Sequence, residues 1–586
     1  MKGLAGLVLL CACVQAESPP AWTVAKSDHF EIYSQAGGDA ARSALIWFEE
    51  LRAFFQQTGV DLDERQPIRV IAFRSAKEYN AYRLRPTADA YYVGTESRDY
   101  IVMPALGADR FRVAAHEYAH AMMHAAGLKF PLWLGEGIAE FFSTIRIGAQ
   151  GCEIGGELPA HSQVLQRRAW VPLADLFALS EKSPFLESRE NSSVFYAESW
   201  MITEMLVLSP AYSSRLSDLF AALKSGAPGV QALPSVYGKP LNRIARDAQL
   251  WAVKRNAQPV KLPGVSMDDV AVTTSALSPF AARSLIAELI LATGELDRAE
   301  TLYRDLERES PENGGVWAAL GTIAIRKGDR ESALQHWRQA LQMGVDDASL
   351  CFRYAVLAEE AGLPANEIRA ALERAIELNP NFDDARYRLA LLENNTGDYQ
   401  TALGHFQAMR HVNPARAYGY WSAMAYALDE LGRREDAQAA AQKATVYAAT
   451  PSEREHAAQL AYVAQTDVAV QFSRDANGRT QLITRRVPHG TTDWNPFIEP
   501  GDEIRRAEGQ LRSIDCQENK VTGVSIQAAD EQLNLSIPDP LQVLMRNAPN
   551  EFTCGAQSGV TVLVQFAISK SQAGNVNGIL RSMEFR

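Results

Sequence analysis

The sequence has no basic excess and no long apolar run in its interior. Its 58 Lys and Arg residues stand against 70 Asp and Glu residues, a formal net charge of -12. This balance disfavours nucleic acid as the main partner, because a protein needs clustered positive charge to displace the counterions of the phosphate backbone. After the N-terminal region, no segment reaches the roughly 18 uninterrupted apolar residues that a membrane-spanning helix requires.

Several catalytic and cysteine motifs are also missing. There is no G-x-S-x-G element, so a serine nucleophile has little support. A phosphate-binding glycine loop is absent as well. The chain has six cysteines, and none forms the close CxxC pairing of a zinc ribbon or a redox motif. Any chemistry must therefore come from other side chains.

The N-terminal segment predicts export. Residues 1–16, "MKGLAGLVLLCACVQA", place Lys2 before an apolar run that ends in small residues at Ala16. This pattern is typical of a signal peptide, so we expect a periplasmic or secreted protein. Lipid attachment at Cys13 is the alternative, and it would tether the protein to a membrane as a lipoprotein.

The composition changes along the chain and predicts a multidomain protein. A length of 586 residues is too great for one hydrophobic core and favours three or four units. Strand-like and helix-like stretches mix in the first part, helical periodicity dominates the second, and short strands make up the third. The units that we expect are an α+β domain (18–261), a linker with at most one short strand (262–279), an all-α repeat domain (280–465) and a small all-β barrel or sandwich (466–586).

The second part repeats itself. Its glycines at positions 294, 328, 362, 397 and 432 are spaced by 34, 34, 35 and 35 residues, and an alanine follows four of them after five residues. This pattern resembles the tetratricopeptide repeat, and Trp317, Leu320 and Gly321 match the start of its first helix. About five stacked repeats would form a concave surface suited to a polypeptide substrate or protein partner. An irregular helical bundle is the alternative.

The last part contains two cysteines beside strand-like runs. Cys516 and Cys554 are the best candidates for a disulfide in an oxidising compartment, and two independent buried thiols are the alternative. The sequence indicates no ligand for this domain.

The strongest chemical motif is H-E-x-x-H, formed by His116, Glu117 and His120. On a helix, residues four apart lie on one face, so both imidazoles can bind a single Zn²⁺ ion. Glu117 would then lie beside the metal, where it can act as general base toward a water. A zinc site of this kind still needs a third protein ligand.

The segment "PLWLGEGIAEFF" supplies candidates for that ligand. With H-E-x-x-H, its "WLGEG" resembles the glutamate-zincin metallopeptidases, and the resemblance assigns the third ligand role to Glu136. Glu140, one helical turn later, is the fallback ligand, although a supporting carboxylate is its preferred interpretation. His124 lies about 12 Å along the helix axis from His116, too far to share the ion, and is interpreted as a supporting or packing residue.

The wider pattern of residues 25–255 resembles the peptidase MA-like domains of exported bacterial proteins, which often precede tetratricopeptide repeats. The resemblance implies that a downstream tyrosine stabilises the oxyanion, and Tyr196 in "FYAESW" is our candidate. Its alternative role is packing against Phe195 and Trp200. The resemblance also implies that "DYIVMPA" (99–105) is an edge strand on which a substrate adds.

Together these patterns predict an exported zinc-dependent peptidase whose repeats recruit a polypeptide. Zn²⁺ would be held by His116, His120 and Glu136, with Glu117 as general base and Tyr196 as oxyanion donor. The alternative is a non-catalytic envelope scaffold or assembly factor, in which the peptidase-like domain is structural and the repeats bind a partner.

Overall fold

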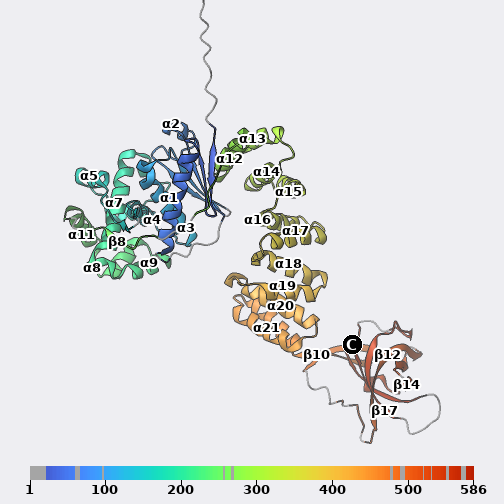
Figure 1. Ribbon diagram of the computed structural model, residues 1–586. Helices are drawn as coiled ribbons and strands as arrows, with labels where there is room; N and C mark the ends of the chain where they lie inside the picture. Colours follow the sequence, from blue (N-terminus) through green and yellow to red (C-terminus); the bar gives the residue numbers. More distant parts are fainter. Residues whose placement is uncertain are drawn as a thin grey trace, which may run out of the picture. The chain divides into compact units, whose positions relative to one another are not determined.

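The chain forms two compact units, residues 1–345 and 346–586 (Figure 1). The computed structural model describes residues 21–57, 59, 66–95, 98–148, 150–254, 258–265, 270–474, 480–488, 495, 497–499, 501–518, 520–529, 531–549, 553–568 and 576–586. The predicted signal peptide and Cys13 lie outside these residues. In the part of the chain that the structure describes, no helix combines the length and apolar character needed to cross a membrane.

A six-stranded mixed sheet organises the first unit. Its strand order is β4-β5-β3-β2-β1-β9, and β2, β3 and β5 run parallel. The other strands are antiparallel to their neighbours. The strands are β1 (Thr23–Lys26), β2 (Phe30–Ser34), β3 (Ile68–Ala72), β4 (Tyr91–Gly94), β5 (Asp99–Met103) and β9 (Thr273–Ala276).

Two expectations about this sheet need correction. The strand in "DYIVMPA" is β5, and it is not an edge strand, because β4 pairs with its outer side. The predicted linker, residues 262–279, contains β9, which pairs along its whole length with β1 and so belongs to the sheet. The short strand that the sequence allowed for in this segment is thus present, and the sequence did not indicate that it joins the sheet.

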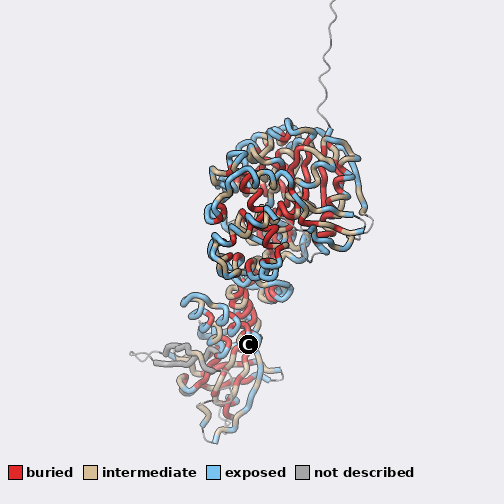
Figure 2. The backbone as a smooth tube through the Cα atoms, turned by 90° about the vertical axis from the view of Figure 1, so that its left-hand side faces the viewer, coloured by how far each residue is buried: buried red, intermediate tan, exposed pale blue. Residues whose placement is uncertain are grey.

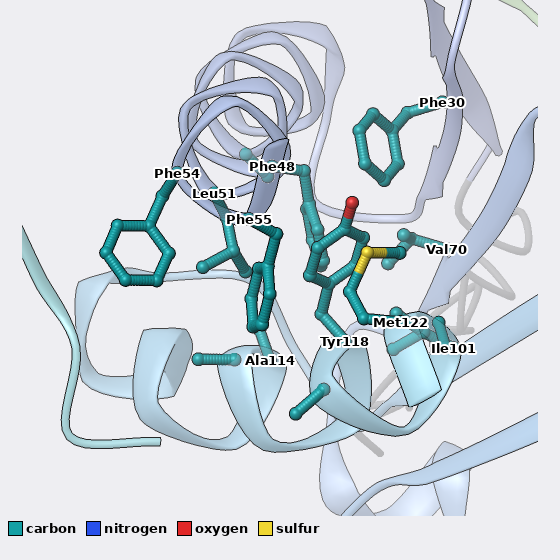
Figure 3. Packing of buried hydrophobic residues seen from close by; sticks show 14 of the residues in the cluster. Phe30, Phe48, Leu51, Phe54, Phe55, Val70, Ile101, Ala114, Tyr118 and Met122 are labelled. Carbon is teal, nitrogen blue, oxygen red and sulfur yellow. The ribbon is translucent and has the colours of Figure 1, made fainter. Parts of the chain in front are cut away.

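Helices cover both faces of the sheet. On one face, α1 (Gly38–Gln57) and α3 (Phe111–Ala125) enclose a core that includes Phe30, Phe48 and Tyr118 (Figure 3). On the other face, Leu285 and Leu289 of α12 (Pro279–Ala292) pack against strand residues. The buried stretches of the tube in Figure 2 correspond to these layers. The first helix of the repeats is therefore part of the core of the α+β domain.

A helical lobe follows the sheet in sequence and has its own core around Trp133, Phe195 and Leu233. A small three-stranded sheet, β6-β7-β8, joins its two ends. The elements are α4 (Leu132–Phe142), β6 (Arg146–Gly148), β7 (Gly151–Ile154), α5 (Pro159–Arg167), α6 (Leu173–Ala178), α7 (Arg189–Leu208), α8 (Pro210–Ser213), α9 (Leu216–Lys224), α10 (Gly229–Tyr237), α11 (Leu241–Lys254) and β8 (Val260–Leu262).

The predicted repeats are five pairs of helices followed by one further helix. Each pair is joined at one of the five periodic glycines, whose φ angles lie between +69° and +87°, a conformation that glycine adopts without strain. Two pairs belong to the first unit and three to the second. The helices after α12 are α13 (Leu296–Glu309), α14 (Gly314–Arg326), α15 (Arg330–Gln342), α16 (Ala348–Glu360), α17 (Ala365–Leu378), α18 (Asp383–Thr396), α19 (Tyr399–Ala408), α20 (Ala417–Glu430), α21 (Arg434–Tyr447) and α22 (Pro451–Ala464).

The C-terminal strands include a closed five-stranded barrel. Strands β12, β13, β14, β18 and β17 pair in that order, and β17 returns to β12. Strands β10, β11, β15 and β16 extend this sheet, and the sequence reading missed β11 and β16. The strands are β10 (Thr466–Arg474), β11 (Thr480–Pro488), β12 (Ile504–Gln517), β13 (Lys520–Ala528), β14 (Gln532–Ser536), β15 (Leu544–Arg546), β16 (Gly555–Ala556), β17 (Thr561–Ile568) and β18 (Gly578–Phe585).

The disulfide prediction is confirmed. Cys516 and Cys554 are bonded, with their Cα atoms 5.9 Å apart, and the bond fastens β12 to the segment that leads into β16. Cys152 and Cys351 are buried free thiols.

A network of ionised side chains joins the sheet to α12. Arg69 of β3 donates to Glu31 of β2 at 2.6 Å and also pairs with Glu288 of α12. Tyr100 of β5 donates a hydrogen bond to the same Glu288 carboxylate. Burial would raise the pKa of Glu31, but Arg69, Lys26 and Arg98 outweigh this effect and lower it to about 2.

We expect Arg69→Met to destabilise the first unit by about 2 kcal/mol, because it removes the cation that Glu31 and Glu288 share, while Lys26 and Arg98 remain beside Glu31. The contribution of ionised Glu31 to the free energy of unfolding is fully present above the ordinary pKa of 4.5 and is lost as the pH falls toward 2. The stability difference between wild type and variant should therefore shrink across that range. Denaturation at several pH values measures it. Arg74→Met, which removes an exposed pair with Glu78, is the control and should change stability by less than about 0.5 kcal/mol. A pH-independent difference would contradict the assignment to Glu31.

Candidate metal centre

Helix α3 presents the two histidines of the motif on one face. Its other face carries Ala114, Tyr118 and Ala121, which are fully buried against the sheet and α1. The helix ends at Ala125, and the φ of +63° at Gly127 lets the Leu128 amide reach back to the Met123 carbonyl at 2.8 Å. The core thus fixes the rotation of α3, and this rotation directs His116 and His120 toward α4.

Helix α4 brings Glu136 to these histidines. Trp133 and Leu134 anchor its first turn in the core of the helical lobe. At Gly137 the helix crosses α7 so closely that an added Cβ would lie 2.1 Å from Thr203 Oγ1 and 2.4 Å from the Ser199 carbonyl oxygen. The glycine after Glu136 is therefore required by the packing of two helices.

Three ligand atoms form a nearly equilateral triangle. His116 Nε2 and His120 Nε2 are 3.3 Å apart, and Glu136 Oε2 lies 3.3 Å and 3.4 Å from them. Zinc binds such atoms at about 2.0–2.2 Å, and tetrahedral angles then separate the ligand atoms by about 3.3–3.6 Å. The three residues thus fit a tetrahedral Zn²⁺ ion, with the fourth position left for a non-protein ligand.

The triangle is recessed but accessible. The side chains of His116, His120 and Glu136 are 12%, 21% and 14% exposed. Glu136 Oε2 is buried and makes no hydrogen bond within the described residues. Burial opposes ionisation of this carboxyl, but the charges of His120 and His116 outweigh burial and lower the pKa of Glu136. A buried, ionised oxygen that faces two imidazole nitrogens at 3.3 Å and 3.4 Å fits the role of a cation ligand.

Glu140 lies behind the triangle. Its Oε1 is 3.5 Å from His116 Nδ1, on the far side of that ring from Glu136, and its Oε2 is 3.0 Å from Arg112 and 3.2 Å from His161. Burial would raise the pKa of Glu140, but these partners outweigh burial and lower the pKa to about 2. Glu140 is placed to orient the His116 ring, as carboxylates behind metal-bound histidines do. Among the described residues, the fallback role as a ligand has no support from the geometry.

Sequence reasoning missed two partners of Glu140. Arg112 could have been found, because it lies four residues before His116 and hence on the same face of α3. His161 comes from α5, and no local pattern links it to the motif.

Glu117 is buried, with 7% exposure. Burial raises the pKa of its carboxyl, and the charges of Glu136 and Glu140 act in the same direction, against His116 and His120. A carboxylate with a raised pKa accepts a proton more readily than an exposed one.

Tyr196 reaches the site from α7. Its ring centroid is 6.3 Å from that of His116. The charge of Glu136, followed by burial, raises the pKa of Tyr196 well above its ordinary value. The phenol therefore stays neutral and keeps a hydrogen to donate. It also packs against Phe195, with centroids 5.4 Å apart, as the alternative packing role predicts.

His124 lies outside the triangle. Its Nδ1 is 3.2 Å from Asp99 Oδ1 of β5, and the same oxygen accepts a hydrogen bond from Tyr92 of β4 at 3.0 Å. The Tyr92 ring lies beside His120, with centroids 6.4 Å apart. This group connects α3 to the strands at the β4 edge, and the sequence reading did not include Asp99 or Tyr92.

Comparisons with known proteins concern the helical repeats. The sequence model of the tetratricopeptide repeat family matches residues 371–404. The chain is 29% identical over 164 residues to cellulose synthase 2 operon protein C of Komagataeibacter xylinus, covering 27% of this chain and 12% of that protein. It is 30% identical over 118 residues to the formate-dependent nitrite reductase complex subunit NrfG of Escherichia coli O157:H7, covering 19% and 58%. These matches span less than two thirds of either relative.

Solved structures also match part of this chain. The crystal structure of YrrB, a TPR protein with an unusual peptide-binding site, is 21% identical with a TM-score of 0.27, covering 30% of this chain and 90% of that one. A MamA crystal structure is 19% identical with a TM-score of 0.25, covering 31% and 94%. The prediction of tetratricopeptide repeats is confirmed, and such repeats are protein-interaction modules.

We expect Gly137→Ala to push α4 away from α7, because the clash at 2.4 Å involves a backbone oxygen. Zinc affinity should fall at least tenfold, and the unfolding midpoint should fall by several degrees, which calorimetric zinc titration and thermal unfolding measure. Gly135→Ala is the matched control, since an added Cβ there meets nothing within 4 Å. It should leave zinc affinity unchanged and stabilise α4 by up to about 1 kcal/mol. Equal effects of the two variants would refute the packing role.

Proposed function

We propose that the chain is a zinc-dependent peptidase. The observation that carries this proposal is the triangle of His116 Nε2, His120 Nε2 and Glu136 Oε2, with separations of 3.3–3.4 Å. A zinc ion held by such a set polarises a carbonyl and lowers the pKa of a coordinated water. Glu117, adjacent to His116 on α3, adds the proton acceptor that hydrolysis requires.

The protein side chains would divide the remaining tasks. Glu117 would take the proton from the attacking water and pass it to the leaving amine. Tyr196, kept neutral by its surroundings, would donate a hydrogen bond to the oxygen of the scissile carbonyl as negative charge develops there. Glu140 would hold the His116 ring in place through Nδ1.

We infer that the substrate adds as a strand to β4. This strand is the sheet edge at the metal end, and its Tyr92 lies beside His120. An extended peptide on that edge would pass close to the triangle.

Repeats on the same chain supply a protein-binding surface, so we propose that they recruit the polypeptide. Export to the periplasm or beyond, with or without a lipid anchor, remains a proposal that rests on the N-terminal sequence. The disulfide between Cys516 and Cys554 is consistent with an oxidising compartment.

The second candidate is a non-catalytic envelope scaffold or assembly factor. The comparisons favour it, because they concern repeats that bind proteins and say nothing of catalysis. In that function the triangle would hold zinc for structural purposes or hold no metal at all. The buried Glu117, which a structural zinc site does not need, favours the peptidase.

We expect the zinc-loaded protein to hydrolyse members of a broad peptide library. The Glu117→Gln variant should retain one zinc per chain but have a kcat/KM at least a thousandfold lower. Chelation should abolish hydrolysis, and added zinc should restore it. His120→Ala is the paired control, because it should lose zinc and activity together. Hydrolysis that persists in Glu117→Gln would refute the mechanism, and an inactive, correctly folded, zinc-loaded wild type would favour the scaffold.

We expect Tyr196→Phe to lower kcat about a hundredfold with little change in KM or zinc content, since it removes one donor to the developing charge. Steady-state kinetics and metal analysis measure these quantities. A variant with a raised KM and an unchanged kcat would assign Tyr196 to substrate packing instead.

A further inference from the structure

The sheet edge opposite β4 is open. Strand β9 is the outermost strand there, all four of its residues are exposed, and among the described residues it pairs with β1 alone. Natural proteins protect such edges with lysine, proline, bulges or covering elements. The sequence of β9, Thr-Thr-Ser-Ala, contains no charged residue and no proline.

The register identifies the backbone groups that face outward. The Leu277 amide donates to the Trp22 carbonyl at 2.8 Å, so these two residues form a hydrogen-bonded pair. Along an antiparallel ladder, hydrogen-bonded and non-hydrogen-bonded pairs alternate. Thr274 and Ala276 therefore form non-hydrogen-bonded pairs with β1, and their N–H and C=O groups point away from β1. These groups can accept another strand without disturbing the existing ladder.

A cavity of about 550 Å³ adjoins this edge over the sheet face that carries α12. Its walls come from the sheet and from the first helices of the first two repeats, α12 and α14. They combine apolar side chains with hydroxyl and charged groups, among them Ser275, Tyr33, Arg69, Phe280, Ser284 and Val316. A mixed lining of this kind suits an aromatic side chain with a polar end, such as tyrosine.

We propose that β9 and this cavity form a docking site for an extended polypeptide segment, which joins the sheet as a strand and places an aromatic side chain in the cavity. The cavity is lined in part by α12 and α14, helices of the first two repeats, and repeats of this kind are protein-interaction modules, so the occupant that we propose is a polypeptide. Side chains alternate along a strand, so a residue level with Ser275 projects over the same sheet face as the cavity.

This site is separate from the candidate metal centre. Five strand spacings separate β9 from β4, which corresponds to about 24 Å. A segment on β9 is therefore anchored and not cleaved, and the proposal holds for either function considered above.

The test uses the full-length protein and a library of acetylated, amidated nonapeptides randomised at five central positions. Wild type should select peptides rich in an aromatic residue. Thr274→Pro removes one outward N–H, which an edge strand tolerates, and should weaken the binding of selected peptides at least tenfold in fluorescence polarisation. Thr274→Val keeps the N–H and should bind within twofold of wild type.

Ser284→Phe fills the cavity without touching the edge, and it should abolish the preference for an aromatic residue. If the unfolding midpoint shows that Thr274→Pro is misfolded, Ser284→Phe still tests the proposed site. The proposal is overturned if wild type selects no peptide, or if correctly folded Thr274→Pro and Ser284→Phe both bind like wild type. A wild-type dimer that Thr274→Pro converts to monomers in sedimentation would also overturn it, because the edge would then pair with a second copy of the chain.

Discussion

The structure of the first unit depends on a sheet that must be covered on both faces. Val70 and Ile101 face α1 and α3, whereas Ile71 and Val102 face the opposite side, where α12 packs. Since both faces are apolar, removing the repeats would expose the second face to water. The boundary between the α+β domain and the repeats is therefore a shared core, reinforced by the ionised network of Arg69 and Glu288. The first repeat is therefore not a module on a flexible tether.

How much of the fold and of the candidate site the sequence predicts depends on how far apart in the sequence the interacting residues lie. His116 and His120 were predictable because a four-residue spacing on a helix determines which side chains share a face. The periodic glycines predicted the repeats for a similar local reason. The pairing of β9 with β1 joins residues about 250 positions apart in the sequence, and no local pattern encodes it. The same holds for His161, which reaches Glu140 only through the packing of α5.

The Glu136 assignment came from resemblance, and the structure adds its physical cause. A ligand from a second helix requires α4 to lie at a fixed height and rotation relative to α3. Trp133 sets the rotation by its burial, and Gly137 sets the height by allowing contact with α7. Because α7 also carries Tyr196, the crossing that places the third ligand places the phenol beside His116 as well. The tryptophan and glycine of the motif thus serve packing, and its glutamate lies with the two histidines as a candidate metal ligand.

The electrostatics of the centre bear on the choice between enzyme and scaffold. Three carboxylates, Glu117, Glu136 and Glu140, lie around His116 in a largely buried space, and burying carboxylates is costly unless cations compensate. Glu136 and Glu140 have such compensation, since their pKa values are lowered by the neighbouring histidines. Glu117 is less well compensated, because burial and the charges of Glu136 and Glu140 outweigh the two histidines and raise its pKa. Packing gives no reason to bury an acid whose charged form is unfavourable. A role in proton transfer from water would give one. This asymmetry among the three carboxylates is consistent with the proposed role of Glu117 as proton acceptor.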